Sequence, residues 1–384
     1  MSDKKVTDSR AGLSSIRLED LEDFVRGAAL LGAGGGGDPY VGRLILEREL
    51  ERGGQANILD IDQLADDALI VSVCVMGAPT VMIEKVPSVT ALENALRQME
   101  QRLGRRADAL IPLEIGGINS TVPLVLGTRL GLPIVNADGM GRAFPELQMV
   151  TFGIYGTSMS PLIVCSERGD SVEINALSNL SGERLARSIT SEMGGAAHVA
   201  LYSMTGAETK TRSIRGTLSV ALDTGRAIRS ARLSGQRPTE ALFDALSLLA
   251  EPRSGRVLFS GKVMDVQRNI RGGFSVGEVT IDRDTESSDR VRVDFQNEFL
   301  VAYRGDTAIA STPDIIAVLD EDTGEPITSD ALKFGQRVQL VGISVPELMR
   351  TPEALTVVGP RAFNINMDYR PLEFEQQSPV SLPI

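Results

Sequence analysis

The sequence predicts an α/β N-terminal domain with a mainly parallel sheet, followed by a β-rich C-terminal unit of sandwich or barrel-like form. Two observations support this fold class. Between residues 57 and 139, Val- and Ile-rich segments alternate with helical patterns, as expected for buried parallel strands separated by helices. After Gly255, short strand-like segments are separated by Gly, Asp and charged turns, which is typical of an all-β unit.

The chain begins with two predicted helices. Apolar residues at helical spacing indicate an amphipathic helix over residues 18–31, which a run of glycines ends. A second helix is expected to start at Asp38 and Pro39, because Asp is a favoured N-cap and Pro suits the first helical position. Gly53 and Gly54 are expected to end it.

The remaining elements follow from the same patterns. Strands are expected at 57–61, 68–77, 109–117 and 133–139, with helices at 89–103 and 120–131 and short strands within 151–178. Helices are then expected at 185–193, 214–228 and 238–250, with a strand at 198–204. The later strands are expected at 255–266, 274–281, 290–295, 298–305, 307–311, 314–320 and 336–345.

The length of 384 residues is enough for two domains. We expect an N-terminal α/β domain with the glycine-rich loop over residues 16–178, and a C-terminal domain over 179–380. The second domain is expected to have a helical lead at 179–252 and a β-rich part at 256–360.

Composition excludes several classes of partner. A net charge of −12 repels phosphate backbones and anionic membranes, so neither nucleic acid nor a membrane is expected as a partner. No apolar run reaches about 18 residues, and the opening ten residues lack the apolar stretch of a signal peptide. Two separated cysteines favour a reduced, cytoplasmic setting. The edges of the β unit need cover, so a homo-oligomer is expected.

The glycine run, Gly34, Gly35, Gly36 and Gly37, raises the question of what needs bare backbone. With Gly32 it fits the dinucleotide-binding pattern G-x-G-x-x-G, but that site requires a preceding strand, whereas a helix is predicted here. A dinucleotide is therefore disfavoured. We expect instead that the loop approaches a ligand or another chain, and that its N–H groups favour negative charge.

Two segments that follow predicted strands carry candidate functional side chains. In the segment PLEIGGINS, Glu114 is a candidate base, and Asn119 and Ser120 are candidate substrate-binding residues. The alternative is a surface acid with Asn119 or Ser120 as a helix cap. In NADGMGRAFPELQM, Asp138 and Glu146 are candidate bases. The alternative there is a capped turn with a surface Arg–Glu pair.

Further candidates are less specific. Arg142 is a candidate donor to charge that develops on the substrate, or could instead hold a substrate carboxylate as a two-pronged clamp. Glu84, beside Lys85, could belong to a buried pair or an exposed one, and Asp38 could be a catalytic carboxylate or only an N-cap. The single histidine, His198, fits a core position. No cofactor motif is present, and a divalent metal held by Asp and Glu stays open.

These segments predict one pocket. The carboxyl ends of strands form the ligand crevice of α/β sheets, so the glycine loop, the 114–120 turn and the 136–146 turn are expected to line a common cavity. A small molecule is the expected ligand.

The chain resembles the S-methyl thiohydantoin desulfurase family. Similar segments run in order over about residues 18–375: LGAGGGGDPYVGRL, MGAPTVMIEK, PLEIGGINS, NADGMGRAFPELQM, FSGKVMDVQRNIRGGFSVGEVTI, VDFQNEFLVA, PDIIAVLD and VGPRAFNINMDYRPLEF. Ala33 stands where Thr is common in the family. The resemblance implies an N-terminal domain ending near residue 178 and a second domain that contains the β-rich part.

The resemblance also implies a reaction class. It implies a link to hydantoinase and oxoprolinase pathways and replacement of an S-methyl group on a thiohydantoin by oxygen, with release of methanethiol. It implies no site residues, so those named above rest on the sequence pattern. The alternatives are a non-catalytic subunit of a hydantoinase-type assembly and a nucleotide-binding oxidoreductase.

Overall fold

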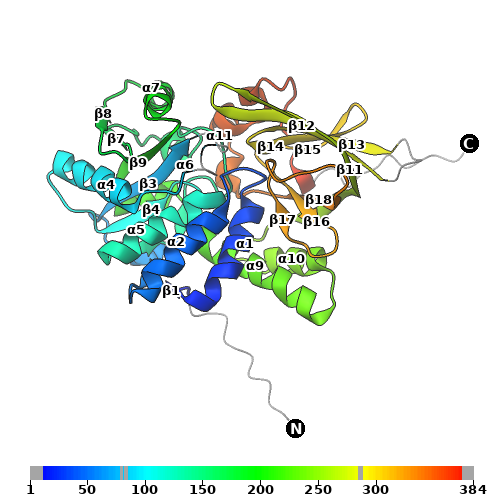
Figure 1. The fold of residues 1–384 in the computed structure, drawn as a ribbon, viewed down its shortest axis with the longest axis horizontal. Coiled ribbons are helices and arrows are strands. Elements are labelled where there is room, and N and C mark those ends of the chain that lie inside the picture. The colour runs from blue at the N-terminus through cyan, green and yellow to red at the C-terminus, as the bar shows by residue number, and fades with distance from the viewer. Residues whose placement is uncertain (1–11, 78–80, 82–84, 284–288, 374–384) are drawn as a thin grey trace, which may run out of the picture.

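The computed structural model describes residues 12–77, 81, 85–283 and 289–373. Two large sheets lie side by side along the long axis of the molecule, with helices α1 and α9 packed between and below them (Figure 1). Among the described residues, no helix is both long and apolar enough to cross a membrane.

The helices are α1 (Leu21–Leu31), α2 (Pro39–Glu51), α4 (Val89–Leu103), α5 (Val122–Leu130), α6 (Thr151–Ile154), α7 (Asn179–Glu192), α8 (Gly206–Arg212), α9 (Thr217–Ser234), α10 (Pro238–Ser247) and α11 (Pro352–Val358). The strands of the first half are β1 (Ser15–Ile16), β2 (Ala56–Leu59), β3 (Leu69–Gly77), β4 (Ala109–Pro112), β5 (Ile134–Val135), β6 (Ala137–Asp138), β7 (Leu162–Cys165), β8 (Ser171–Ile174), β9 (Ala196–Thr205) and β10 (Ile214–Arg215). The later strands are β11 (Gly255–Arg271), β12 (Phe274–Asp282), β13 (Arg290–Gln296), β14 (Glu298–Arg304), β15 (Thr307–Ser311), β16 (Ile315–Asp320), β17 (Pro326–Ile327) and β18 (Arg337–Ile343).

The first sheet is mixed, with a parallel core. Its order is β1-β2-β5-β4-β3-β9-β7-β8, and the pairs from β2 through β3 are parallel, whereas β1, β9, β7 and β8 join antiparallel. The predicted α/β class is confirmed. Strand β9 lies between β3 and β7 although it follows residue 178, so this sheet is completed by chain from beyond the predicted N-terminal segment.

Strand β3 is buried on both faces, as its continuous apolar sequence predicts. Val71, Val73 and Val75 pack against α4 and α5 on one face. Cys74 and Met76 belong to the larger core on the other face, where α7 lies. This double cover fixes the carboxyl end of β3, where the candidate site is found.

The second sheet is entirely antiparallel, in the order β15-β14-β13-β12-β11-β18-β16-β17. It curls so that β14 also contacts β16, and one apolar core fills its concave side. The β-rich C-terminal unit is therefore confirmed as a single curled sheet. The turn between β13 and β14 points toward the first sheet and brings C-terminal residues to the carboxyl end of β3.

Candidate active site

A cavity of about 70 Å³ lies where the two domains meet. Its wall comes from the glycine loop, the ends of β3 and β4, the segment after β6, helix α7 and the β13–β14 turn. The lining residues are Gly36, Gly37, Val75, Met76, Gly77, Leu113, Glu114, Ile118, Asn119, Met140, Phe144, Pro145, Glu146, Leu147, Arg187, Asn297 and Glu298. The three segments that the sequence places in one pocket do meet here.

Glu114 is a buried carboxyl group, not a surface acid. It follows β4, and only 5% of the residue is exposed. Its Oε1 accepts a hydrogen bond of 2.8 Å from the Asn119 side chain, while its buried Oε2 has no hydrogen-bond partner in the described structure. Burial, and next the nearby Glu298, raise the pKa of Glu114 to about 8, although the Asn119 side chain and the Phe144 backbone N–H act in the opposite direction. A buried acid with one unused oxygen is suited to proton transfer.

Asn119 orients Glu114. Its Oδ1 accepts from the Val75 backbone N–H at 2.8 Å, and its Nδ2 donates to the Val75 carbonyl at 3.1 Å. These two contacts with the end of β3 fix which way round the amide lies, so an N–H must face Glu114. Asn119 therefore holds one carboxyl oxygen and leaves the other free. Its neighbour Ser120 instead donates to the Gly117 carbonyl and does not line the cavity.

Glu298 is a second buried carboxyl group, contributed by the C-terminal sheet. It directly follows Asn297, whose positive φ of 58° closes the β13–β14 turn, a backbone conformation that Asn tolerates. Glu298 is 1% exposed, its Oε1 accepts from the Gly36 N–H at 3.1 Å, and its Oε2 has no partner in the described structure. Burial raises the pKa of Glu298 to about 8, although nearby Arg142 acts in the opposite direction.

The loop consists of glycines because two other parts of the same chain pack closely against its backbone and leave no room for side chains. A Cβ on Gly34 would lie 2.3 Å from the Phe299 ring, and one on Gly35 would lie 2.1 Å from Oε1 of Glu298. The Gly36 carbonyl accepts from the Ile118 N–H at 2.8 Å. The expected close partner, a ligand or another chain, is thus first of all the C-terminal domain. As predicted, helix α1 precedes the loop, and the exclusion of a dinucleotide stays a prediction.

Asp138, a predicted base, does not line the cavity. Its two oxygens accept backbone N–H groups from Ile115, Met140 and Gly141 at 2.8–3.2 Å. Burial raises its pKa to about 7, but these hydrogen bonds already use its acceptors. Its position fits a structural role, in which it ties the Glu114 segment to the segment after β6.

Arg142, the predicted clamp, is also internal. Its guanidinium donates to the carbonyls of Ala143, Pro313, Asp314 and Phe299 at 2.7–3.2 Å, and none of it is exposed. A guanidinium that donates to four carbonyls has no pair of N–H groups left to bind a substrate carboxylate in a bidentate way. It instead fastens the segment after β6 to the C-terminal sheet.

The remaining candidates lie in different places. Glu146 lines the cavity, and its carboxylate accepts a hydrogen bond from the Gln148 side chain. Asp38 is exposed and caps α2 by accepting from the Tyr40 N–H at 2.9 Å, so its N-cap alternative is confirmed. Glu84 lies outside the described residues. No group of three or more His, Cys, Asp or Glu within the described ranges is arranged to hold a metal ion.

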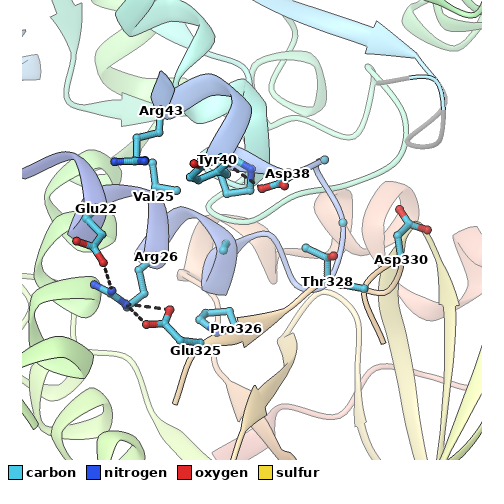
Figure 2. Close-up of a pocket in the computed structure, with 16 residues that line it drawn as sticks. Glu22, Val25, Arg26, Asp38, Tyr40, Arg43, Glu325, Pro326, Thr328 and Asp330 are labelled. Atoms are coloured by element: carbon cyan, nitrogen blue, oxygen red, sulfur yellow. Dashed lines mark hydrogen bonds and ion pairs between the residues drawn. The ribbon is translucent and has the colours of Figure 1, made fainter. Parts of the chain in front are cut away.

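The glycine loop also lines a larger groove, of about 740 Å³ (Figure 2). Helix α1, the start of α2 and the segment around β17 form its walls. Three of its charged residues pair with one another, because Arg26 donates to Glu22 and Glu325. None of its described side chains carries a buried polar atom without a partner. Of these two cavities, the smaller one holds the buried carboxyl oxygens without a partner.

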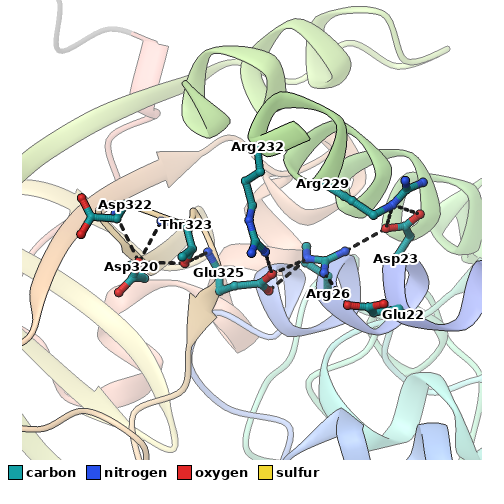
Figure 3. Close-up of polar contacts among 9 residues, drawn as sticks. All are labelled: Glu22, Asp23, Arg26, Arg229, Arg232, Asp320, Asp322, Thr323 and Glu325. Carbon is teal, nitrogen blue, oxygen red and sulfur yellow. Dashed lines mark hydrogen bonds and ion pairs between the residues drawn. The ribbon is translucent and has the colours of Figure 1, made fainter. Parts of the chain in front are cut away.

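An ion-pair network beside this groove holds the domains together (Figure 3). The Arg26 guanidinium on α1 donates to Asp23 at 2.8 Å and to Glu325 at 2.8 Å. Arg229 on α9 donates to Asp23, and Arg232 donates to Glu325. The Arg26–Asp23 pair at its centre is shielded from solvent, with side chains only 5% and 3% exposed, whereas Glu325 is 38% exposed. The network fixes α1, and hence the glycine loop, against the C-terminal sheet.

Arg26→Met is expected to lower the free energy of unfolding by about 3 kcal/mol, because it leaves Asp23 and Glu325 short of a buried partner. The measurement is urea unfolding at pH 7. Arg237→Met is the matched control: its ion pair with Glu240 is 81% and 66% exposed, so the loss should stay below about 1 kcal/mol. Equal losses for the two variants would contradict the assignment.

The fold and the site define a class of protein: an α/β domain and a curled antiparallel domain that enclose a small cavity with two buried carboxyl groups, one from each domain. Two family models match the chain, the S-Me-THD-like N-terminal domain over residues 19–176 and the S-Me-THD-like C-terminal domain over residues 178–372. The chain therefore belongs to the S-Me-THD-like family, which confirms the resemblance found in the sequence.

Known structures and curated proteins add little about function. The chain is similar to a crystal structure of a protein from Chromobacterium violaceum, with a TM-score of 0.79 and 25% sequence identity over 94% of this chain and 100% of that chain. No curated protein matches. The similarity supports the two-domain fold.

Sequence reasoning missed Glu298 and Arg187. Glu298 follows Asn297 at a turn, where an acidic residue is ordinarily exposed, and nothing in the pattern places that turn against the glycine loop. A signal was present, because VDFQNEFLVA is one of the segments that resemble the family. Arg187 lies on the amphipathic helix α7, where an arginine is ordinarily a surface residue.

Proposed function

We propose that this protein hydrolyses a hydantoin-like ring, with an S-methyl thiohydantoin as the favoured substrate, to give the hydantoin and methanethiol. One observation carries the proposal: Glu114 and Glu298 line the same cavity, and each has a buried oxygen without a partner. Two acids with raised pKa values can share the work of base and acid at neutral pH.

The reaction balances with water as the only co-reactant. One carboxylate takes a proton from water as its oxygen attacks the ring carbon that bears sulfur. The other, as the carboxylic acid, gives its proton to the adjacent ring nitrogen. The tetrahedral intermediate then loses the C–S bond: sulfur leaves with the proton taken from water, the new hydroxyl gives its proton to the second carboxylate, and the carbon becomes a carbonyl. No oxidant or reductant is needed.

The cavity also suits this chemistry because both carboxyl groups lie in a buried and partly apolar setting. Glu114 and Glu298 are almost fully buried, and Met76, Leu113 and Met140 contribute apolar surface to the cavity wall. Low polarity strengthens the interaction of a carboxyl group with a charge that develops nearby.

The direct test is thiol release by the purified chain from an S-methyl thiohydantoin, followed with a thiol reagent. Turnover that scales with protein concentration is expected, with the hydantoin as the second product by mass spectrometry. If no thiohydantoin or hydantoin is turned over, with or without added divalent metal, the alternative role as a non-catalytic partner of a hydantoinase-type system gains support.

A further inference from the structure

Arg187 is the one basic side chain among the described residues that line the cavity. Three contacts position its guanidinium. Nε donates to Glu183, Nη2 donates to the Pro145 carbonyl at 3.0 Å, and the guanidinium lies over the Phe274 ring, 4.3 Å from its centre. It therefore joins α7, the segment after β6 and the end of the β11–β12 hairpin.

The carboxylate that holds Arg187 is itself fixed. Glu183 is 3% exposed, and its Oε2 accepts from the Leu147 N–H at 3.1 Å. An arginine held by a buried acid, a carbonyl and an aromatic face has lost most of its freedom before any ligand arrives. Such preorganisation is expected of a group that binds a ligand in one orientation.

One nitrogen of the guanidinium has no hydrogen-bond acceptor among the described residues. Nη1 makes no hydrogen bond to any residue within the described ranges, and 19% of the Arg187 side chain is exposed. Four of the five N–H groups of Arg142 donate to carbonyls. Arg187 makes only two side-chain hydrogen bonds among the described residues, and it lines the cavity that holds Glu114 and Glu298.

We infer that Arg187 binds the ring carbonyl that is joined to the reacting carbon through a ring nitrogen. Arg187 would thereby select rings that contain this carbonyl over rings that lack it. The inference rests on the proposed function. In a thiohydantoin the reacting carbon is joined through a ring nitrogen to a carbonyl. When water adds, negative charge develops on that nitrogen and spreads to the carbonyl oxygen. A fixed guanidinium at this oxygen stabilises the charge as it forms.

The test uses two neutral rings of nearly equal size. Hydantoin contains the carbonyl, and 2-imidazolidinone has a methylene group in its place. Calorimetry of wild type is expected to give tighter binding of hydantoin by about 10- to 100-fold, the contribution of a hydrogen bond to a charged group. In Arg187→Gln this difference should vanish, because only hydantoin loses a partner. Arg187→Lys should restore part of this difference in affinity, because lysine keeps the positive charge but lacks the planar guanidinium.

Arg184→Gln is the matched control, an exposed arginine one turn away on α7. It should bind both rings as wild type does. A purely structural role of Arg187 predicts that Arg187→Gln weakens both rings equally, which would overturn the inference, as would equal binding of the two rings by wild type. The proposed function is judged separately by thiol release: an inert wild type that still prefers hydantoin through Arg187 refutes the reaction and leaves the binding site standing.

Discussion

Glu114→Gln and Glu298→Gln are each expected to lower the turnover of an S-methyl thiohydantoin by about 10²- to 10⁴-fold, the usual contribution of a general acid or base. Glutamine keeps the size and most of the hydrogen bonds of glutamate. It can still accept from Asn119 or from the Gly36 N–H, so the cavity should keep its shape. What is lost is the ability to ionise, and so to take up or give a proton in the reaction. Single-turnover measurements on both variants separate this loss from slow product release.

The pH profile distinguishes the two roles. Both carboxyl groups have a pKa raised to about 8, so the pair passes from fully protonated to fully ionised around that pH. If one group must be ionised and the other protonated, kcat/KM should rise with pH toward 8 and fall above it. The variant that lacks the acid should lose the falling limb, and the variant that lacks the base should lose the rising limb.

The same two variants should be more stable than wild type at pH 8. A folded-state pKa above that of the unfolded chain means that the folded protein binds more protons between about pH 4.5 and 8, so its stability falls as pH rises through that window. Glutamine does not ionise and removes this dependence. A lower melting temperature for both variants would show that their loss of activity reflects misfolding.

The matched control for these substitutions is Glu240→Gln, which changes an exposed glutamate on α10. It should leave both turnover and the pH profile unchanged. If wild type turns over and both cavity variants retain full activity, the two carboxyl groups are not the reacting acids, and Glu146, which also lines the cavity, becomes the next candidate.

Gly35→Ala is expected to lower turnover by about 10- to 100-fold without changing any ionisable group, because a group displaced by about 1 Å from its productive position commonly loses that much. The added Cβ would lie 2.1 Å from Oε1 of Glu298 and 2.5 Å from its carboxyl carbon. The Glu298 side chain must therefore move away from the glycine loop and lose its hydrogen bond from Gly36. The measurement is kcat/KM together with the melting temperature.

Gly12→Ala is the control for Gly35→Ala. The closest atom to its added Cβ is an Asp60 carboxylate oxygen at 3.8 Å, an ordinary contact, so it should behave as wild type. Neither glycine has a positive φ, so the comparison isolates crowding from backbone strain. If Gly35→Ala retains wild-type kinetics, the position of Glu298 against the loop does not matter for the reaction.

The local chemistry of the sequence was sufficient for most of the elements. The Asp38–Pro39 pair predicts the start of α2, where Asp38 caps the helix and Pro39 occupies its first turn. The apolar run at 68–77 predicts a buried strand, and β3 is buried on both faces. These features depend on neighbours within a few positions, so the sequence reveals them directly. The mixed pairing of β9 beside β3 depends on contacts more than a hundred residues apart and was not predicted.

The cavity, too, combines features that the sequence predicts with features that depend on long-range contacts. The sequence by itself determined the family, the two-domain class and the segments that meet, including Glu114 and Asn119 after a buried strand. Only the tertiary structure decided which acids are available. The acceptors of Asp138 are filled by backbone N–H groups of its own turn, from Met140 and Gly141, and by the N–H of Ile115 from the neighbouring strand end. The domain contact instead buries Glu298 and brings it beside the glycine loop. The availability of a carboxyl group is set by which dipoles and charges reach it through space, and neither spacing nor residue type along the chain records that.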